Sequence, residues 1–219
     1  VISAKIEQSC TILVVSSAEI YGIPTSVPIT ESHPLHPTSP YGESRLEQEK
    51  LIQEYQEKWN LALILCRSFP HTGPGQATDF VCSNFAFQIA QIEARNQEPV
   101  LRVGNLDAER DFTDVRDVVK AYYLLSTKVK RGTYNICSGK VMSIASILKN
   151  LLGQSKVVIT VEQEASRMRP SDIPLLLGDN TLLRQTVPWE PAIPFTQTLT
   201  ELLNYWRKQE RVPVPRNNT

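Results

Sequence analysis

Short apolar runs alternate with longer amphipathic segments along this chain. The runs 11–16 and 61–66 are almost continuously apolar, which is typical of strands in a parallel sheet that is covered on both faces. Between them, 41–59 repeats apolar residues at helical spacing and begins after Ser39-Pro40, a good entry into a helix. Strands that alternate with helices in this way predict an α/β fold.

The rest of the chain continues the same alternation. Asp114 is placed to cap a helix, and the proline-rich polar segment 212–219 predicts a loose tail. We expect four further helices, at 79–95, 114–125, 143–152 and 196–207, and two further strands, at 133–137 and 157–161.

Composition narrows the class of protein. Hydrophobic residues make up 41% of the chain and charged residues 21%, which are the values of a soluble globular protein. The 23 basic and 23 acidic residues balance, so we expect no nucleic acid and no membrane as partner. The apolar runs are too short to span a bilayer, and the first residues lack a signal-peptide layout. Four widely separated cysteines without a Cys-x-x-Cys pair favour the cytoplasm and argue against a metal site.

Candidate chemistry follows the first apolar run. The segment 16–22, Ser-Ser-Ala-Glu-Ile-Tyr-Gly, brings hydroxyls and a carboxylate to the end of a strand, where open α/β sheets bind ligands; a serine-capped loop is the alternative. Tyr41 and Arg45 are four residues apart and share a helical face, although for this spacing alone a surface cation on a helix is the commoner explanation. A fixed cation favours the ionised form of a phenol, which can then exchange a proton with a carbonyl oxygen. The matching hydride must come from a cofactor.

Three motifs together resemble the extended short-chain dehydrogenase/reductase family. They are the segment 16–22, the segment 39–44 that reads Ser-Pro-Tyr-Gly-Glu-Ser, and a strand that ends in Arg-Ser-Phe at 67–69. The longer segments 67–76 and 103–119, with Tyr-Asn-Ile-Cys-Ser-Gly at 134–139, are similar to the GDP-4-keto-6-deoxy-mannose reductases within that family. The resemblance implies an oxidoreductase with NADP or NAD as cofactor and a nucleotide-diphosphate sugar, most simply a GDP-sugar, as substrate.

The resemblance also implies a domain organisation. It predicts a partial Rossmann-like parallel sheet together with a smaller mixed α/β domain. Residues 1–70 and 113–138 would form the dinucleotide-binding domain, and 71–112 with 139–211 the nucleotide-sugar-binding domain. A homodimer would form through the helices 41–59 and 79–95, unless their apolar stripes pack within one subunit.

By position, the resemblance assigns the reaction to four residues. Ser17 would bind the substrate oxygen, Tyr41 would be the acid or base, and Arg45 takes the place of the family's lysine. Tyr41, Arg45 and His71 would also contact the cofactor, although a lone loop histidine is as often a hydrogen-bonded turn residue. Glu19 matches the glutamate that removes a proton in related dehydratases. The segment 111–119 resembles the reductases instead, so a dehydratase or epimerase is the alternative.

Substrate binding is assigned to Ser17, Asn105, Arg110 and Arg169. The two arginines match those that hold the nucleotide diphosphate, because a guanidinium binds phosphate oxygens in a two-pronged way. A salt bridge from Arg110 to Asp111, or from Arg169 to Asp172, is the structural alternative.

The sequence departs from the family pattern at three places. It contains no Gly-x-x-Gly-x-x-Gly turn, so we expect it to begin before the family's fourth strand, without about three βα units. Arg45 replaces lysine, and Pro70 replaces an asparagine that contacts substrate in the family. The chain would then be either part of a longer enzyme or a non-catalytic nucleotide-sugar-binding subunit.

Overall fold

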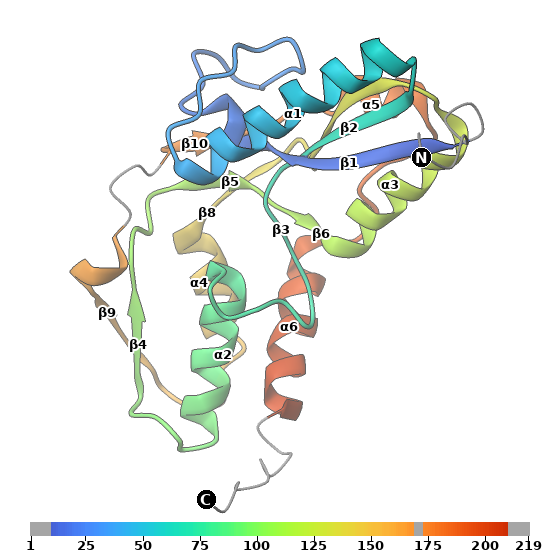
Figure 1. The fold of residues 1–219 in the computed structure, drawn as a ribbon. Coiled ribbons are helices and arrows are strands. Elements are labelled where there is room, and N and C mark those ends of the chain that lie inside the picture. The colour runs from blue at the N-terminus through green and yellow to red at the C-terminus, as the bar shows by residue number, and fades with distance from the viewer. Residues whose placement is uncertain (1–9, 169–172, 210–219) are drawn as a thin grey trace, which may run out of the picture. The chain divides into compact units, whose positions relative to one another are not determined.

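The chain folds into two compact units, which we describe separately (Figure 1). The computed structural model describes residues 10–168 and 173–209. The first unit is built from Val1–His71, Ala108–Met142 and Ser171–Ala192. The second unit is built from Thr72–Asp107, Ser143–Pro170 and Ile193–Thr219. Within the described ranges, no helix combines the length and the apolar character that a membrane span requires.

A parallel sheet forms the centre of the first unit. Its strands are β1 (Thr11–Ser17), β2 (Ala62–Ser68) and β7 (Gly132–Ile136), in the order β1-β2-β7. The register pairs Thr11 with Ala62 at one end and Ser17 with Ser68 at the other. All three strands therefore end at the same edge, and the strands expected at 11–16, 61–66 and 133–137 are confirmed within one or two residues.

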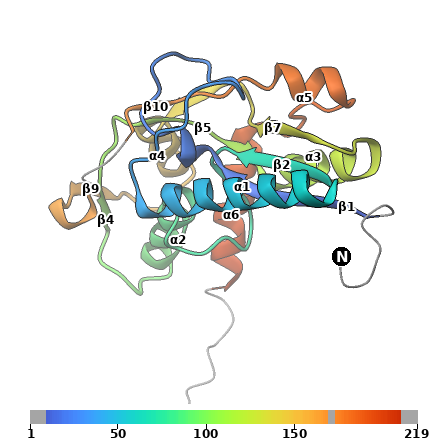
Figure 2. The same ribbon diagram turned by 45° about the horizontal axis from the view of Figure 1, so that its top comes forward.

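Two helices cover opposite faces of this sheet. Cys66 belongs to a buried cluster with Val118 and Leu125 of α3 (Val115–Lys128), whereas the next residue, Arg67, bonds to Glu49 of α1 (Pro40–Trp59). Successive residues of a strand point to opposite faces, so α1 and α3 lie on the two sides. Figures 1 and 2 show α1 running along one side of β1 and β2.

Capping residues set where these helices begin. Ser39 has an extended backbone and its hydroxyl accepts a hydrogen bond from the Gly42 N–H, while Pro40 occupies the first helical position of α1. Asp114 caps α3 by accepting from the Arg116 N–H at 2.8 Å, which confirms the predicted cap.

Several short elements complete the first unit. The structure adds a 3-10 turn, η1 (Ala18–Tyr21), and a short helix, α5 (Thr181–Thr186). A small sheet has the order β10-β5-β8, and a two-stranded pair joins β3 to β6. The bounds are β10 (Leu175–Leu176), β5 (Glu109–Asp111), β8 (Val141–Ser143), β3 (His71–Thr72) and β6 (Thr113–Asp114).

The unit boundaries differ from the sequence-based division. That division gave residues 71, 108–112, 139–142 and 173–192 to the second domain, whereas they belong to the first unit. The physical reason is strand pairing, because β10 pairs in parallel with β5. The binding role assigned to each domain stays a prediction.

The second unit is mostly helical. Its helices are α2 (Val81–Glu93), α4 (Ile144–Leu152) and α6 (Phe195–Gln209), and β4 (Val100–Val103) pairs in parallel with β9 (Thr160–Gln163) beside the turn η2 (Ala165–Arg167). The apolar face of α2, with Phe85 and Ile89, is buried in this unit, where α2 contacts α4 and α6. The apolar stripe of 79–95 is thus used within the unit. The strand expected at 157–161 begins later, at Thr160.

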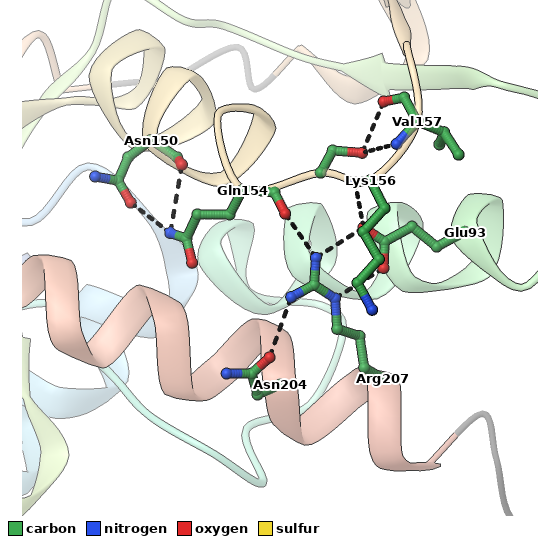
Figure 3. A network of polar contacts seen from close by, with 8 residues as sticks. Glu93, Asn150, Gln154, Lys156, Val157, Asn204 and Arg207 are labelled. Carbon is green, nitrogen blue, oxygen red and sulfur yellow. Dashed lines mark hydrogen bonds and ion pairs between the residues drawn. The ribbon is translucent and has the colours of Figure 1, made fainter.

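A polar network fixes α6 to α2 (Figure 3). The Nε and Nη2 atoms of Arg207 each donate to the Glu93 carboxylate at 2.7 Å, and Nη2 also donates to the Gln154 carbonyl at 2.7 Å. The Lys156 N–H donates to the same carboxylate at 2.9 Å. Burial alone would raise the pKa of Glu93, but the bonds from Arg207 and Lys156 lower this pKa overall.

Candidate active site

The candidate site begins where β1 and β2 end. Ser17 and Ser68 are register partners on these parallel strands, so their side chains point to the same side of the sheet. The Ser17 hydroxyl also accepts a hydrogen bond from the Glu19 N–H at 3.2 Å and thereby caps η1. Two hydroxyls therefore lie side by side at the carboxyl edge of the sheet.

A tight junction connects η1 to α1. The Ser39 hydroxyl donates to Oε2 of Glu19 at 2.8 Å and accepts from the Gly42 N–H at 3.0 Å. A Cβ atom on Gly42 would lie 2.8 Å from the Glu19 carbonyl oxygen, so only glycine permits this approach. The junction places the first turn of α1, which carries Tyr41, beside the turn that follows Ser17.

Tyr41 and Arg45 contact each other on α1. The guanidinium carbon of Arg45 lies 5.0 Å from the centre of the Tyr41 ring, and Nη1 donates to Gln48 at 2.9 Å. The cation thus lies over the face of the phenol ring, a favourable arrangement for a positive charge. The Tyr41 side chain is 48% exposed, so its surroundings can admit a ligand.

Tyr122 of α3 joins this group and was not found from the sequence. Its phenol oxygen lies 2.5 Å from the Ser68 hydroxyl. Burial raises the pKa of Tyr122 to about 12, against the bond from Ser68, and the charge of Tyr41 is among the smaller contributions that raise it. Tyr122 therefore stays protonated at neutral pH, in the electrostatic neighbourhood of Tyr41. The only sequence signal was its helical spacing from Val118 and Leu125.

The segment after β2 turns back at His71. Its Nδ1 atom lies 2.9 Å from the Phe69 carbonyl oxygen, the kind of turn contact that was the alternative to cofactor binding. Pro70 lacks the amide of the family's asparagine, and its carbonyl accepts from the Thr113 N–H at 3.0 Å. Pro70 therefore has a structural contact here.

Arg110 lies in β5 of the first unit. Its Nη1 atom donates to the Glu109 carbonyl at 2.9 Å and to the Pro174 carbonyl at 3.4 Å. Both of these contacts orient the guanidinium through backbone carbonyl oxygens. The role of Arg110 as a substrate ligand stays a prediction.

The next residue, Asp111, is a structural centre. Its buried carboxylate accepts from the Ser138 N–H and hydroxyl at 2.8 and 2.6 Å, from the Gly139 N–H at 2.9 Å, and from the Gly178 N–H at 3.3 Å. Burial raises the pKa of Asp111 in spite of these bonds. Asp111 in the segment 103–119 and Ser138 and Gly139 in the segment 134–139, which both supported the family resemblance, thus also hold the first unit together.

The other two predicted substrate ligands are placed less fully. Asn105 belongs to the second unit, where its Oδ1 atom accepts from the Asp107 N–H at 2.9 Å in a turn. Arg169 lies outside the described residues. The predicted lack of a metal site also stays a prediction; in residues 10–168 and 173–209, no His, Cys, Asp and Glu side chains gather into a metal-binding group.

Comparison with known proteins identifies the family. The family model described as GDP-mannose 4,6 dehydratase matches residues 1–202. The chain belongs to this family of extended short-chain dehydrogenases/reductases. The α/β structure agrees with this assignment and with the predicted Rossmann-like fold class.

Individual relatives refine the comparison. GDP-6-deoxy-D-mannose reductase of Pseudomonas aeruginosa is 34% identical over 206 residues, which are 93% of this chain and 68% of the reductase. Human GDP-mannose 4,6 dehydratase is 27% identical over 208 residues, which are 86% of this chain and 56% of the dehydratase. The solved structure of RMD from Pseudomonas aeruginosa complexed with NADPH superimposes with a TM-score of 0.85 at 32% identity, over 91% of this chain and 67% of that one. The chain therefore spans about two thirds of the reductase and just over half of the dehydratase.

Proposed function

We propose that this chain takes part in the NAD(P)-dependent reduction of the 4-keto group of a GDP-6-deoxyhexose. One observation carries the proposal: the η1–α1 junction brings Tyr41 to the carboxyl edge of the sheet where Ser17 ends β1. A hydroxyl and a phenol in that arrangement are what a carbonyl reduction requires on the protein side. The 34% identity to a GDP-6-deoxy-D-mannose reductase supports this choice of substrate class.

In this proposal the Ser17 hydroxyl donates a hydrogen bond to the keto oxygen and polarises the carbonyl. Tyr41 gives its phenol proton to that oxygen as the carbon is reduced, so that an alcohol forms and a phenolate remains. The Arg45 cation over the Tyr41 ring stabilises the negative charge that is left behind. Reduced nicotinamide supplies the hydride that no side chain can provide.

The described residues fit the nicotinamide end of such a cofactor. The hydroxyls of Ser17 and Ser68 line the edge of the sheet, and Tyr41, whose charge affects the pKa of Tyr122, is exposed enough to meet a ligand. Tyr41, Arg45 and His71 would hold that end of the molecule. A solved relative of 32% identity is complexed with NADPH, which supports NADP or NAD here.

Substrate binding completes the proposal. Arg110, oriented by the Glu109 and Pro174 carbonyl oxygens, would bind the diphosphate. The ligand roles of Asn105 and Arg169 rest on the sequence resemblance alone. The names of both relatives above refer to GDP-linked mannose derivatives, which favours a GDP-sugar. A cytoplasmic location remains part of the proposal, supported by the free state of Cys10, Cys66, Cys82 and Cys137.

A homodimer also belongs to the proposal. Leu51, Tyr55 and Trp59 follow one another at four-residue spacing along α1, and all three are exposed. A second copy packed on this stripe would remove the apolar side chains from water. Sedimentation velocity of the chain and of a Leu51→Glu/Tyr55→Glu variant tests this point. A monomer in both samples would contradict it.

A dehydratase is the second candidate, because Glu19 occupies the matching position and the human dehydratase is 27% identical. The Glu19 carboxylate accepts a hydrogen bond from Ser39, the cap of α1, which favours a structural role for it. Incubation with GDP-mannose and oxidised cofactor separates the two. Formation of a 4-keto-6-deoxy sugar, lost in Glu19→Gln, would overturn the reductase proposal.

The direct test follows NADPH absorbance at 340 nm with the full chain and GDP-4-keto-6-deoxy-mannose. We expect substrate-dependent oxidation of NADPH, with a loss of at least 100-fold in Tyr41→Phe, since general acid catalysis contributes about 10² to 10⁴. Saturable NADPH binding without oxidation would instead support a non-catalytic binding subunit. Absence of both would contradict the proposal for this chain.

A further inference from the structure

A charged pair lies buried between β2 and α1. Arg67 is 5% exposed and Glu49 is 1% exposed. Nε of Arg67 donates to both oxygens of Glu49 at 3.2 Å, and Nη2 donates to Oε2 at 2.8 Å. Burial opposes the charge of Arg67, but the bonds and charge of Glu49 raise its pKa overall. The layer between helix and sheet thus contains a full ion pair where apolar packing is the usual choice.

The same guanidinium reaches two further segments. Its Nη1 atom donates to the phenol oxygen of Tyr21 at 3.1 Å and to the Glu31 carbonyl at 2.8 Å. Tyr21, the last residue of η1, donates in turn to Oδ1 of Asn135 in β7 at 2.7 Å. Arg67 therefore connects α1, η1, the loop that contains Glu31, and the middle of the sheet.

Stability alone does not account for this network. Removing two charges from water carries a large desolvation cost, and apolar pairs of similar volume are often as stable as buried ion pairs. Hydrogen bonds, however, are satisfied only over a narrow range of distance and angle. A network that links four elements through one guanidinium therefore fixes their relative positions more tightly than apolar contacts would.

The position that matters is that of Tyr41. Glu49 lies eight residues after Tyr41 on α1, a little over two helical turns along the same rigid element. Glu19 holds the beginning of that helix through Ser39, so α1 is anchored at two points. One of these contacts starts from Glu19, in the turn that follows β1, and the other from Arg67 in β2.

We propose that Arg67 is a positioning residue for Tyr41. Through Glu49, Arg67 fixes the axial position and rotation of α1, and through Tyr21 it fixes the position of η1. The distance between the Tyr41 phenol and the Ser17 hydroxyl is thereby held constant. The expected effect on turnover rests on the proposed function, whereas the expected effect on the position of Tyr41 is independent of that function.

The experiment uses the full chain labelled with 3-fluorotyrosine, in which a Tyr41→Phe variant assigns the Tyr41 signal among the seven tyrosines. The test variants are Glu49→Gln, which keeps the shape, and Glu49→Met/Arg67→Met, which replaces the pair by an apolar one. Glu93→Gln is the control, because the Glu93 side chain is only 8% exposed and is bound by Arg207 in the same two-pronged way in the second unit. Amide hydrogen exchange of the Gly42 N–H, which donates to the Ser39 cap of α1, gives a second readout.

We expect the Tyr41 fluorine signal to shift or split, and exchange at Gly42 to accelerate about tenfold or more, in both test variants and not in Glu93→Gln. In the NADPH assay, kcat should fall about 10- to 100-fold at little changed KM, since small misplacements of a catalytic group have effects of this size. The double variant decides the matter if Glu49→Gln does not fold.

Unchanged Tyr41 and Gly42 signals in a folded test variant would overturn the proposal. Equal changes in Glu93→Gln would do the same, because they would show general destabilisation. If the chain has no reductase activity, the fluorine and exchange results still decide the role of Arg67, so failure of the proposed function is recognised separately.

Discussion

The phenol of Tyr122 lies 2.5 Å from the hydroxyl of Ser68, at the end of β2 where the candidate site begins. The pair joins α3 to the central sheet on the side opposite α1. Because burial raises the pKa of Tyr122 to about 12, its phenol keeps its proton at neutral pH and can donate a hydrogen bond there.

Replacing Tyr122 by Phe leaves the largely buried Ser68 hydroxyl without this partner. We expect the free energy of unfolding to fall by about 1–3 kcal/mol, the usual cost of an unsatisfied buried polar group. Urea unfolding measures it. Tyr123→Phe is the control, because Tyr123 is exposed on the same helix and should change stability by no more than about 0.5 kcal/mol. Equal effects of the two substitutions would show that the Ser68 bond contributes nothing.

Gly42→Ala tests the junction between η1 and α1. Alanine normally favours a helix, but here the added Cβ would lie 2.8 Å from the Glu19 carbonyl oxygen and 3.0 Å from Cβ of Pro37. We expect the free energy of unfolding to fall by about 1–3 kcal/mol, as it does at other overpacked sites. Gly153→Ala is the matched control, since its added Cβ meets only ordinary contacts from 3.4 Å and its φ is −62°. Thermal unfolding should show Gly42→Ala destabilised and Gly153→Ala unchanged or slightly stabilised.

Because of the ion pair between Arg207 and Glu93, we expect the free energy of unfolding to depend on pH. The pKa of Glu93 is lower in the folded chain than its ordinary value of 4.5, so its stabilising effect is complete above that value and is lost as pH falls through the folded pKa. Arg207→Met should reduce stability at pH 7 by about 1–3 kcal/mol, because the Glu93 carboxylate loses its guanidinium partner and keeps only the hydrogen bond from the Lys156 N–H. The difference from the original chain should narrow below pH 4. Denaturant unfolding at pH 7 and pH 3.5 measures both, and a difference that does not depend on pH would contradict the assignment.

Much of this architecture follows from local pattern. The spacing of apolar residues predicted the helix at 41–59, and the residue type predicted the cap at Asp114. Both features can be recognised from residues that are close together in the sequence. Strands of two or three residues, such as β10 and β5, carry no measurable periodicity. Their pairing, which brings 173–192 into the first unit, depends on contacts between distant segments and could not be predicted.

The candidate site was predictable in the same uneven way. Ser17, Tyr41 and Arg45 could be chosen as candidates because motif and helical spacing are local, and their roles stay predictions. In the structure Ser17 ends β1, and Arg45 lies over the Tyr41 ring on α1. The contact between Ser68 and Tyr122 requires knowing that α3 packs on that face of β2. The bond from Ser39 to Glu19 likewise requires the turn of the loop between them, which no spacing rule reveals.

The most direct test of the central claim follows the transfer of deuterium from the cofactor to the sugar. NADPH that carries deuterium at the reactive position of the nicotinamide is incubated with the full chain and GDP-4-keto-6-deoxy-mannose, and the sugar product is analysed by mass spectrometry. We predict one deuterium at C4 of the sugar, with formation of labelled product at least 100-fold slower in Tyr41→Phe. A product without deuterium, or labelling that does not depend on Tyr41, would contradict the account.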